Sequence, residues 1–157
     1  MYRSPSELPE ESRTTIANAL NALLADGLDL HSQTKVAHWN IKGPQFIALH
    51  EMIDGFRTDL DEHIDTMAER VVQLGGTAIG ITQAVAHSTT LTPYPTDIYA
   101  AADHLVALTE RYAKVASAVR AAIDKTDSAG DVDTADLFTS FSRALDKNLW
   151  FLEAHLQ

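Results

Sequence analysis

The sequence predicts an all-α protein: four long helices packed in a bundle, with a long connection between the second and the third. Two observations carry this prediction. Apolar residues recur at intervals of three and four over most of the chain, as they do along one face of a helix. Glycine and proline, which break helices, are concentrated in a few short stretches between these periodic segments. A tight first connection, a long second one and a short third one are typical of a bundle with one crossover.

The first helix is expected over residues 12–40 and the second over 45–74. Gly27 is a tolerable weak point inside the first helix. The stretch 41–44 ends in glycine and proline, which suit the end of one helix and the first turn of the next, so it predicts a tight turn. The glycine pair at 75–76 stops the second helix. The apolar face of the first helix is formed by Ile16, Leu20, Leu23, Leu24, Leu28 and Val36.

Residues 77–95 are the least regular part of the chain and are expected to form the crossover. They end in 91–95, where two prolines prevent a continuous helix. One short helix is expected within the crossover connection, near residues 81–87.

The third helix is predicted to start at a cap formed by Thr96 or Asp97 and to run to about Lys125. Residues 126–130 are small and polar and form the third connection. The fourth helix is expected over residues 133–155.

Composition limits the class of protein. The 157 residues suffice for one core, and they are interpreted as a short tail over 1–11 and one domain over 12–157. The lack of cysteine excludes disulfides and thiolate metal sites. Without a secretory leader or a membrane-length apolar run, we expect a cytoplasmic protein, with association with the nucleoid left open. The 22 acidic and 12 basic residues give a formal charge of −10, which favours cations over nucleic acid as partners.

Two histidines and a carboxylate are expected to meet across the first turn. His38 lies near the end of the first helix and His50 near the start of the second, each five to seven residues from the turn. They should therefore sit at similar heights on adjacent antiparallel helices. Asp54 follows His50 by four residues and lies on the same face, one turn along. These three side chains could converge on one metal ion.

A second pair of carboxylates, Asp65 and Glu69, also has the four-residue spacing. Asp65 follows Asp54 by eleven residues, which is almost a whole number of helical turns, so both pairs lie along one stripe. The helical rise nevertheless separates them by roughly 16 Å. One chain cannot bring both pairs to one ion.

A two-fold axis would close this gap. If the second helix packs antiparallel against its copy, centred near residues 59–60, then His50 and Asp54 of one chain face Asp65 and Glu69 of the other. Such an isologous contact creates two equivalent sites. The sequence also has no Glu-x-x-His motif, which a di-iron centre inside a single bundle normally uses. The spacing therefore predicts a metal site shared between subunits.

These residues belong to longer strings that resemble the Dps family (DNA-binding proteins from starved cells), the miniferritins with a ferritin-like fold. The resemblance implies a hollow dodecamer with ferroxidase sites at its two-fold interfaces and ferric mineral inside. It also implies hydrogen peroxide as the preferred oxidant, with oxygen as an alternative. The family's ligands fall on His38, His50 and Asp54 of one subunit and on Asp65 and Glu69 of its neighbour, and all five match the family pattern. The strings cover nearly the whole chain from the first helix onward: 38–43, Phe46, 49–50, 54–57, 65–70, 75–76, 103–105 and 146–151.

Residues around the site carry further hypotheses. Lys35 precedes His38 by three residues, so it either pairs with a site carboxylate and weakens a second metal position or forms an ordinary surface salt bridge. Trp39 either intercepts radicals from iron oxidation or simply packs at the helix end. The acidic link into the last helix provides ordinary helix-capping charge or, as the family resemblance implies, lines three-fold pores that admit iron through Asp131, Asp133 and Asp136.

The leading expectation is iron storage and detoxification by a ferroxidase, which protects the cell and its DNA from oxidative damage. Zinc or other divalent metals could occupy the same imidazole and carboxylate ligands. The alternatives are a structural, nucleoid-associated shell with little ferroxidase activity and a helical binding module without metal. Direct DNA binding is expected to be weak or absent, since twelve such subunits carry about −120 and the tail has only Arg3 against Glu7, Glu10 and Glu11.

Overall fold

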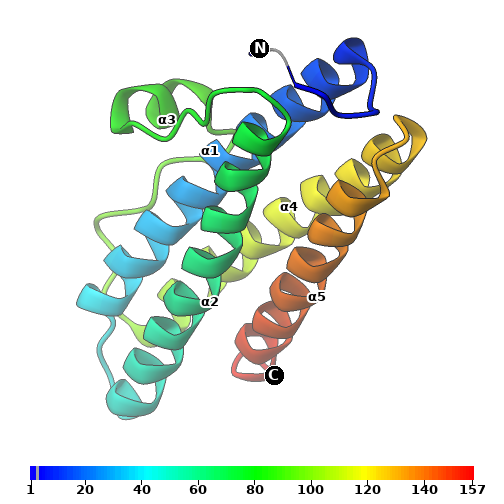
Figure 1. Ribbon diagram of the computed structural model, residues 1–157. Coiled ribbons are helices and arrows are strands. Elements are labelled where there is room, and N and C mark those ends of the chain that lie inside the picture. The colour runs from blue at the N-terminus through cyan, green and yellow to red at the C-terminus, as the bar shows by residue number, and fades with distance from the viewer. Residues whose placement is uncertain (3) are drawn as a thin grey trace.

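The computed structural model describes residues 1–2 and 4–157, and five helices form within them (Figure 1). Two antiparallel hairpins make the bundle. The first pairs α1 with α2 and the second pairs α4 with α5, while α1 also packs on α4 and α2 on α5. The short α3 lies in the long connection between the hairpins. The helices are α1 (Glu10–Asn40), α2 (Phe46–Gln73), α3 (Thr82–Ser88), α4 (Ala101–Ser128) and α5 (Val132–Ala154).

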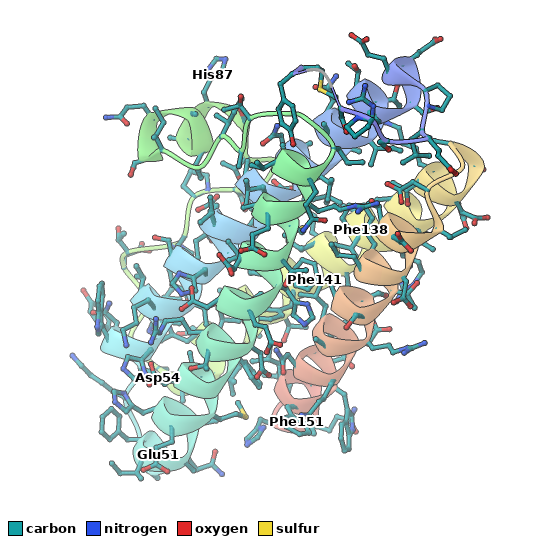
Figure 2. The ribbon with its side chains drawn as sticks, viewed as in Figure 1. Glu51, Asp54, His87, Phe138, Phe141 and Phe151 are labelled. Atoms are coloured by element: carbon teal, nitrogen blue, oxygen red, sulfur yellow. The ribbon has the colours of Figure 1, made fainter. Side chains whose placement is uncertain are left out.

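This arrangement confirms the predicted four-helix bundle with a crossover that carries a short helix. One apolar core runs between the two hairpins, and its largest fully buried side chains are Tyr112, Phe138 and Phe141. Figure 2 shows the two phenylalanines on α5 pointing into the bundle. Among the described residues, every helix is too short or too polar to span a membrane.

Gly27 is more than a weak point in α1. A Cβ at this position would lie 3.3 Å from Ile64 Cγ1 and 3.4 Å from Met67 Cε on α2. The first distance is slightly tighter than ordinary van der Waals contact and the second is at its lower limit, so the missing side chain lets α1 and α2 approach closely. The first hairpin, which carries the candidate metal ligands, depends on this approach.

The predicted start of the third helix is wrong. Helix α4 begins at Ala101, and Thr96 and Asp97 lie in a bend before it. The Ala101 amide donates to the Lys42 carbonyl at 3.1 Å, so a contact with the α1–α2 turn takes the place of a side-chain cap. This long-range contact has no signal in the local sequence.

The third connection is also shorter than predicted. Residues 126–128 continue α4, with Thr126 buried and its hydroxyl donating to the Ala122 carbonyl at 2.8 Å. Helix α5 begins at Val132, one residue earlier than expected, because Asp131 caps it by accepting from the Thr134 amide at 3.0 Å.

Candidate metal centre

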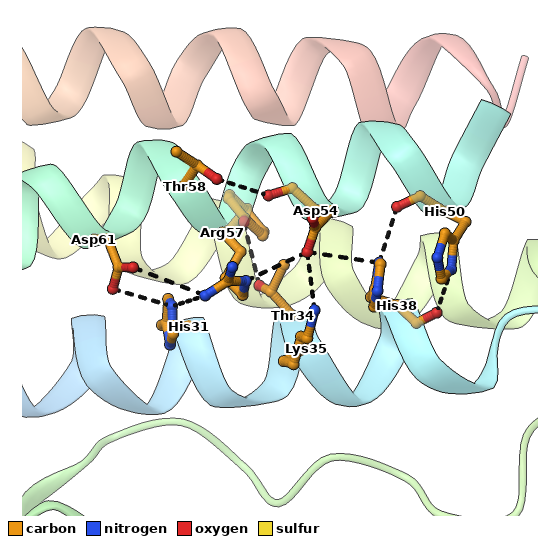
Figure 3. Close-up of polar contacts among 10 residues, drawn as sticks. His31, Thr34, Lys35, His38, His50, Asp54, Arg57, Thr58 and Asp61 are labelled. Atoms are coloured by element: carbon orange, nitrogen blue, oxygen red, sulfur yellow. Dashed lines mark hydrogen bonds and ion pairs between the residues drawn. The ribbon is translucent and has the colours of Figure 1, made fainter. Parts of the chain in front are cut away.

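His38 and His50 meet across the α1–α2 hairpin in a reciprocal arrangement (Figure 3). The Nδ1 atom of His38 lies 2.9 Å from the carbonyl oxygen of His50, and the Nδ1 atom of His50 lies 2.9 Å from the carbonyl oxygen of His38. The two rings stack with their centroids 3.7 Å apart. The tight turn therefore brings together the two histidines that the sequence placed at equal heights.

The carbonyl partners determine where the imidazole protons lie. A carbonyl oxygen only accepts hydrogen bonds, so each Nδ1 must carry the hydrogen. In the neutral ring the lone pair is then on Nε2, which is the form that binds a metal. A second ring nitrogen fixed by an acceptor is the usual support for a metal-binding histidine. Here each histidine receives that support from the backbone of the other.

The stacking also limits how these rings can bind metal. Their planes differ by only 24° and the ring centroids are 3.7 Å apart, so the Nε2 lone pairs of His38 and His50 lie in two nearly parallel, separate planes. An ion about 2.1 Å from one nitrogen cannot also lie in line with the other lone pair. The geometry favours one ion for each histidine over a single ion shared by both.

Asp54 lies beside this pair and is held by cations. Its Oδ1 atom accepts from Lys35 Nζ at 2.9 Å and from Arg57 Nε at 3.4 Å, and it lies 3.8 Å from His38 Nδ1. The hydrogen bond from Lys35 lowers the pKa of Asp54 below its ordinary value, Arg57 acts in the same direction, and partial burial opposes them. The carboxylate is therefore ionised, and contacts between the cations and Oδ1 leave Oδ2 available to a metal.

Asp65 and Glu69 are not brought to this pair within one chain. Both are exposed on the second half of α2, beyond the half that carries His50 and Asp54. Among the described residues, no group of three or more histidine and acidic side chains is placed to hold a metal. A single subunit thus has two separate sets of candidate ligands.

Comparison with known proteins gives the family. A model of the ferritin-like domain matches residues 17–157. The DNA protection during starvation protein of Agrobacterium fabrum is 59% identical over 156 residues, which cover 99% of this chain and 96% of the relative. The chain belongs to the Dps family.

Solved structures agree with this assignment to the Dps family. Mycobacterium smegmatis Dps in its tetragonal form matches with a TM-score of 0.95 at 31% identity, covering all of this chain and 94% of that one. A Dps protein from Vibrio cholerae, described as a member of a broad superfamily of ferritin-like diiron-carboxylate proteins, matches with a TM-score of 0.92 at 27% identity. The match covers 100% of this chain and 98% of the Vibrio cholerae chain.

The Dps-family chain has a second polar cluster that the sequence reasoning missed. His31 Nε2 lies 3.1 Å from Asp61 Oδ1 and 3.4 Å from Arg57 Nη1, which links this cluster to Asp54 (Figure 3). Burial lowers the pKa of His31, and Asp61 partly opposes the change. Helical spacing could have revealed this cluster, because Arg57 follows Asp54 by three residues and precedes Asp61 by four.

Three aspartates of this Dps-family chain were candidates for a pore, and they differ in their surroundings. The side chain of Asp131 is only 2% exposed, because it accepts from Arg70 Nη2 at 2.8 Å as well as capping α5. Asp133 and Asp136 are exposed. The geometry assigns Asp131 a structural role and leaves the other two available to ions.

Trp39 does not pack within the chain. Its side chain is 66% exposed, and Lys35 Nζ lies 6.0 Å from its ring centroid. Packing at the helix end therefore does not account for this tryptophan in an isolated subunit.

Proposed function

We propose that this Dps-family chain assembles into a hollow homo-dodecamer that binds Fe²⁺ between subunits, oxidises it with hydrogen peroxide and stores the ferric product inside. The observation that carries this proposal is the His38–His50 pair with both Nδ1 atoms committed to backbone carbonyls and Asp54 beside it. The two-fold arrangement would add the partner's Asp65 and Glu69. A partner is needed because neither set of ligands suffices alone.

The ligand chemistry supports iron oxidation. Imidazole and carboxylate together suit Fe²⁺, although zinc and other divalent metals could bind the same groups. Carboxylates stabilise the more highly charged ferric product. Two Fe²⁺ ions each give up one electron, and one peroxide molecule takes up both electrons and two protons to form two water molecules. Oxygen would serve as an alternative oxidant.

Oxidation stoichiometry tests this function directly. We expect the assembled protein to consume two Fe²⁺ ions for each peroxide molecule and to suppress hydroxyl radical signals in a spin-trapping assay. Free iron instead transfers one electron to peroxide and releases hydroxyl radical. Two controls give the background yield of hydroxyl radical, one without protein and one with an equal mass of an unrelated acidic protein. A radical yield equal to the background would leave the shell with a purely structural role.

Lys35 should weaken metal binding near Asp54. Its ammonium group contacts the carboxylate at 2.9 Å, so a cation that arrives there must compete with a fixed positive charge. We expect Lys35→Ala to raise the affinity for Zn²⁺, measured by calorimetry, by about twofold to fivefold, as for loss of one partly exposed charge contact. Lys42→Ala is the matched control, because Lys42 lies over the Tyr99 ring at the turn. Unchanged affinity and stoichiometry in Lys35→Ala would contradict this role.

The remaining assignments follow from the same proposal. Asp133 and Asp136 would line a route that admits iron, and Trp39 would intercept radicals that escape the site. Protection of DNA would come from removal of iron and peroxide, because the acidic chain offers few cations for direct binding to phosphates. We assign the protein to the cytoplasm, where Fe²⁺ and DNA occur together.

A further inference from the structure

The last part of the long connection, from residue 89 to residue 100, is called the crossover below, and it is held largely by polar contacts to α1 and α4. Asp26 on α1 accepts from the Thr90 amide at 2.6 Å, and Lys114 on α4 donates to the Thr90 carbonyl. The preceding helix α3 has no buried residue of its own. Only Leu91 joins the buried apolar core from this stretch. The position of the crossover thus depends mainly on hydrogen bonds, with Tyr94 also packed, partly buried, against the core.

Arg111 on α4 provides the largest group of these contacts. Its guanidinium is buried and donates to the Pro93 carbonyl at 2.9 Å, to the Ala107 carbonyl at 2.8 Å and to the Gln33 side chain. All of these acceptors are neutral. The only carboxylate within 4 Å of Arg111 in the described chain is that of Glu110, at 3.8 Å and exposed to solvent. The cation is therefore buried without a buried counter-ion.

Tyr94 lies between this cation and a buried histidine. The guanidinium of Arg111 is 5.2 Å from the Tyr94 ring centroid. His104 stacks against the same ring, and its Nδ1 atom shares a 2.8 Å hydrogen bond with the Tyr94 hydroxyl. The imidazole of His104 is 1% exposed, and its Nε2 atom has no hydrogen-bond partner among the described residues. This surrounding accommodates a neutral imidazole.

Protonation of His104 would disrupt the arrangement. The imidazolium would be a second buried cation on the Tyr94 ring, which Arg111 already contacts. Both of its ring nitrogens would be donors, and the hydrogen on Nε2 would have no acceptor among the described residues. Burial lowers the pKa of His104, while exposed Asp103 and the nearby Ile98 backbone only partly offset it. The α1 carboxylates that face the crossover, those of Asp26 and Asp29, already accept from Thr89 and Thr90.

We propose that His104 is an acid-released latch: its neutral ring holds Tyr94 and the crossover against α1 and α4, and its protonated ring releases them. The four long helices keep their shared core, to which the crossover contributes the buried Leu91 and the partly buried Tyr94. The direction of the pH dependence follows from the lowered pKa of His104 in the closed state. A histidine whose pKa is lowered in the closed state favours closure above its ordinary pKa, and closure weakens as the pH falls below that value. This property is separate from iron chemistry.

Hydrogen exchange of the assembled protein at pH 7.5 and pH 5.0 tests the latch. After correction for intrinsic exchange rates, we expect the opening constant of the crossover amides to increase at pH 5.0. The increase can reach about thirtyfold, the limit for a histidine of pKa 6.5 that ionises freely only in the open state. Core amides of α4 and α5 should change less than twofold. A uniform increase over the whole chain would contradict a local latch.

Three variants separate His104 from other titrating groups. His104→Gln can still hydrogen-bond Tyr94 but cannot ionise, so the increase at pH 5.0 should disappear. Tyr94→Phe removes the bond, so the crossover should already open more at pH 7.5. His63→Gln is the matched control, because burial also lowers the pKa of His63 but this side chain stacks on Phe141 of α5. An acid response that persists in His104→Gln, or normal closure in Tyr94→Phe, would overturn the proposal.

Discussion

Two variants that are each inactive should recover about one quarter of the wild-type rate of peroxide-driven iron oxidation when their subunits are mixed. One variant lacks both imidazoles (His38→Ala with His50→Ala), and the other lacks the distant carboxylates (Asp65→Asn with Glu69→Gln). In a shared site, a mixed dimer has one complete set of ligands and one site with neither set. Random pairing at equal amounts makes half of the dimers mixed, so about a quarter of all sites are complete. Iron oxidation is measured after dissociation and reassembly of the mixture.

The controls distinguish a shared site from simple loss of folding. Mixing without dissociation is the control for subunit exchange, and it should restore nothing. His87→Ala should retain the wild-type rate, because His87 is exposed on α3 and points away from the bundle (Figure 2). Native mass spectrometry shows whether the two variants co-assemble. Co-assembly without recovery would contradict a site shared between subunits, and full activity of the variant without imidazoles would exclude the histidines as ligands.

The bundle could be predicted because its boundaries are encoded locally. Glycine and proline mark the ends of the first two helices, and the structure places α1 and α2 within two residues of the predicted limits. The start of α4 could not be predicted in this way. Asp97 has suitable chemistry for a cap, but the first amide of the helix is satisfied by the Lys42 carbonyl from another part of the chain. Such a contact forms only when the bundle does.

The candidate site likewise has one part that the sequence could predict and one part that it could not. Helical periodicity alone was enough to align His50, Asp54, Asp65 and Glu69 on one stripe of α2. The acceptors that fix the two imidazoles could not be predicted, because they are backbone carbonyls and every residue has one. The aspartates near α5 show the same limit. Composition reveals that they are clustered, but only the fold shows that Asp131 turns inward to meet Arg70.

Replacing Arg70 by alanine should lower the melting temperature of the assembled protein by roughly 6–12 °C. The Asp131 carboxylate is buried and would keep only neutral donors from Thr134, and an uncompensated buried charge costs about 3 kcal/mol. For a domain of this length, each kcal/mol corresponds to about 2–4 °C. The measurement is calorimetry at fixed protein concentration, because assembly contributes to the apparent stability.

Two further variants decide whether the buried charge is the cause. Arg120→Ala breaks an exposed ion pair with Asp146 at 2.8 Å and should cost less than about 1 kcal/mol. Adding Asp131→Asn to Arg70→Ala should restore part of the loss, because an amide can still cap α5 but carries no charge. Side-chain packing would be the cause if Arg70→Ala and Arg120→Ala lowered the melting temperature equally. It would also be the cause if the double variant regained none of the lost melting temperature. Recovery would instead mean that the loss in Arg70→Ala comes from the buried Asp131 carboxylate left without its ion-pair partner.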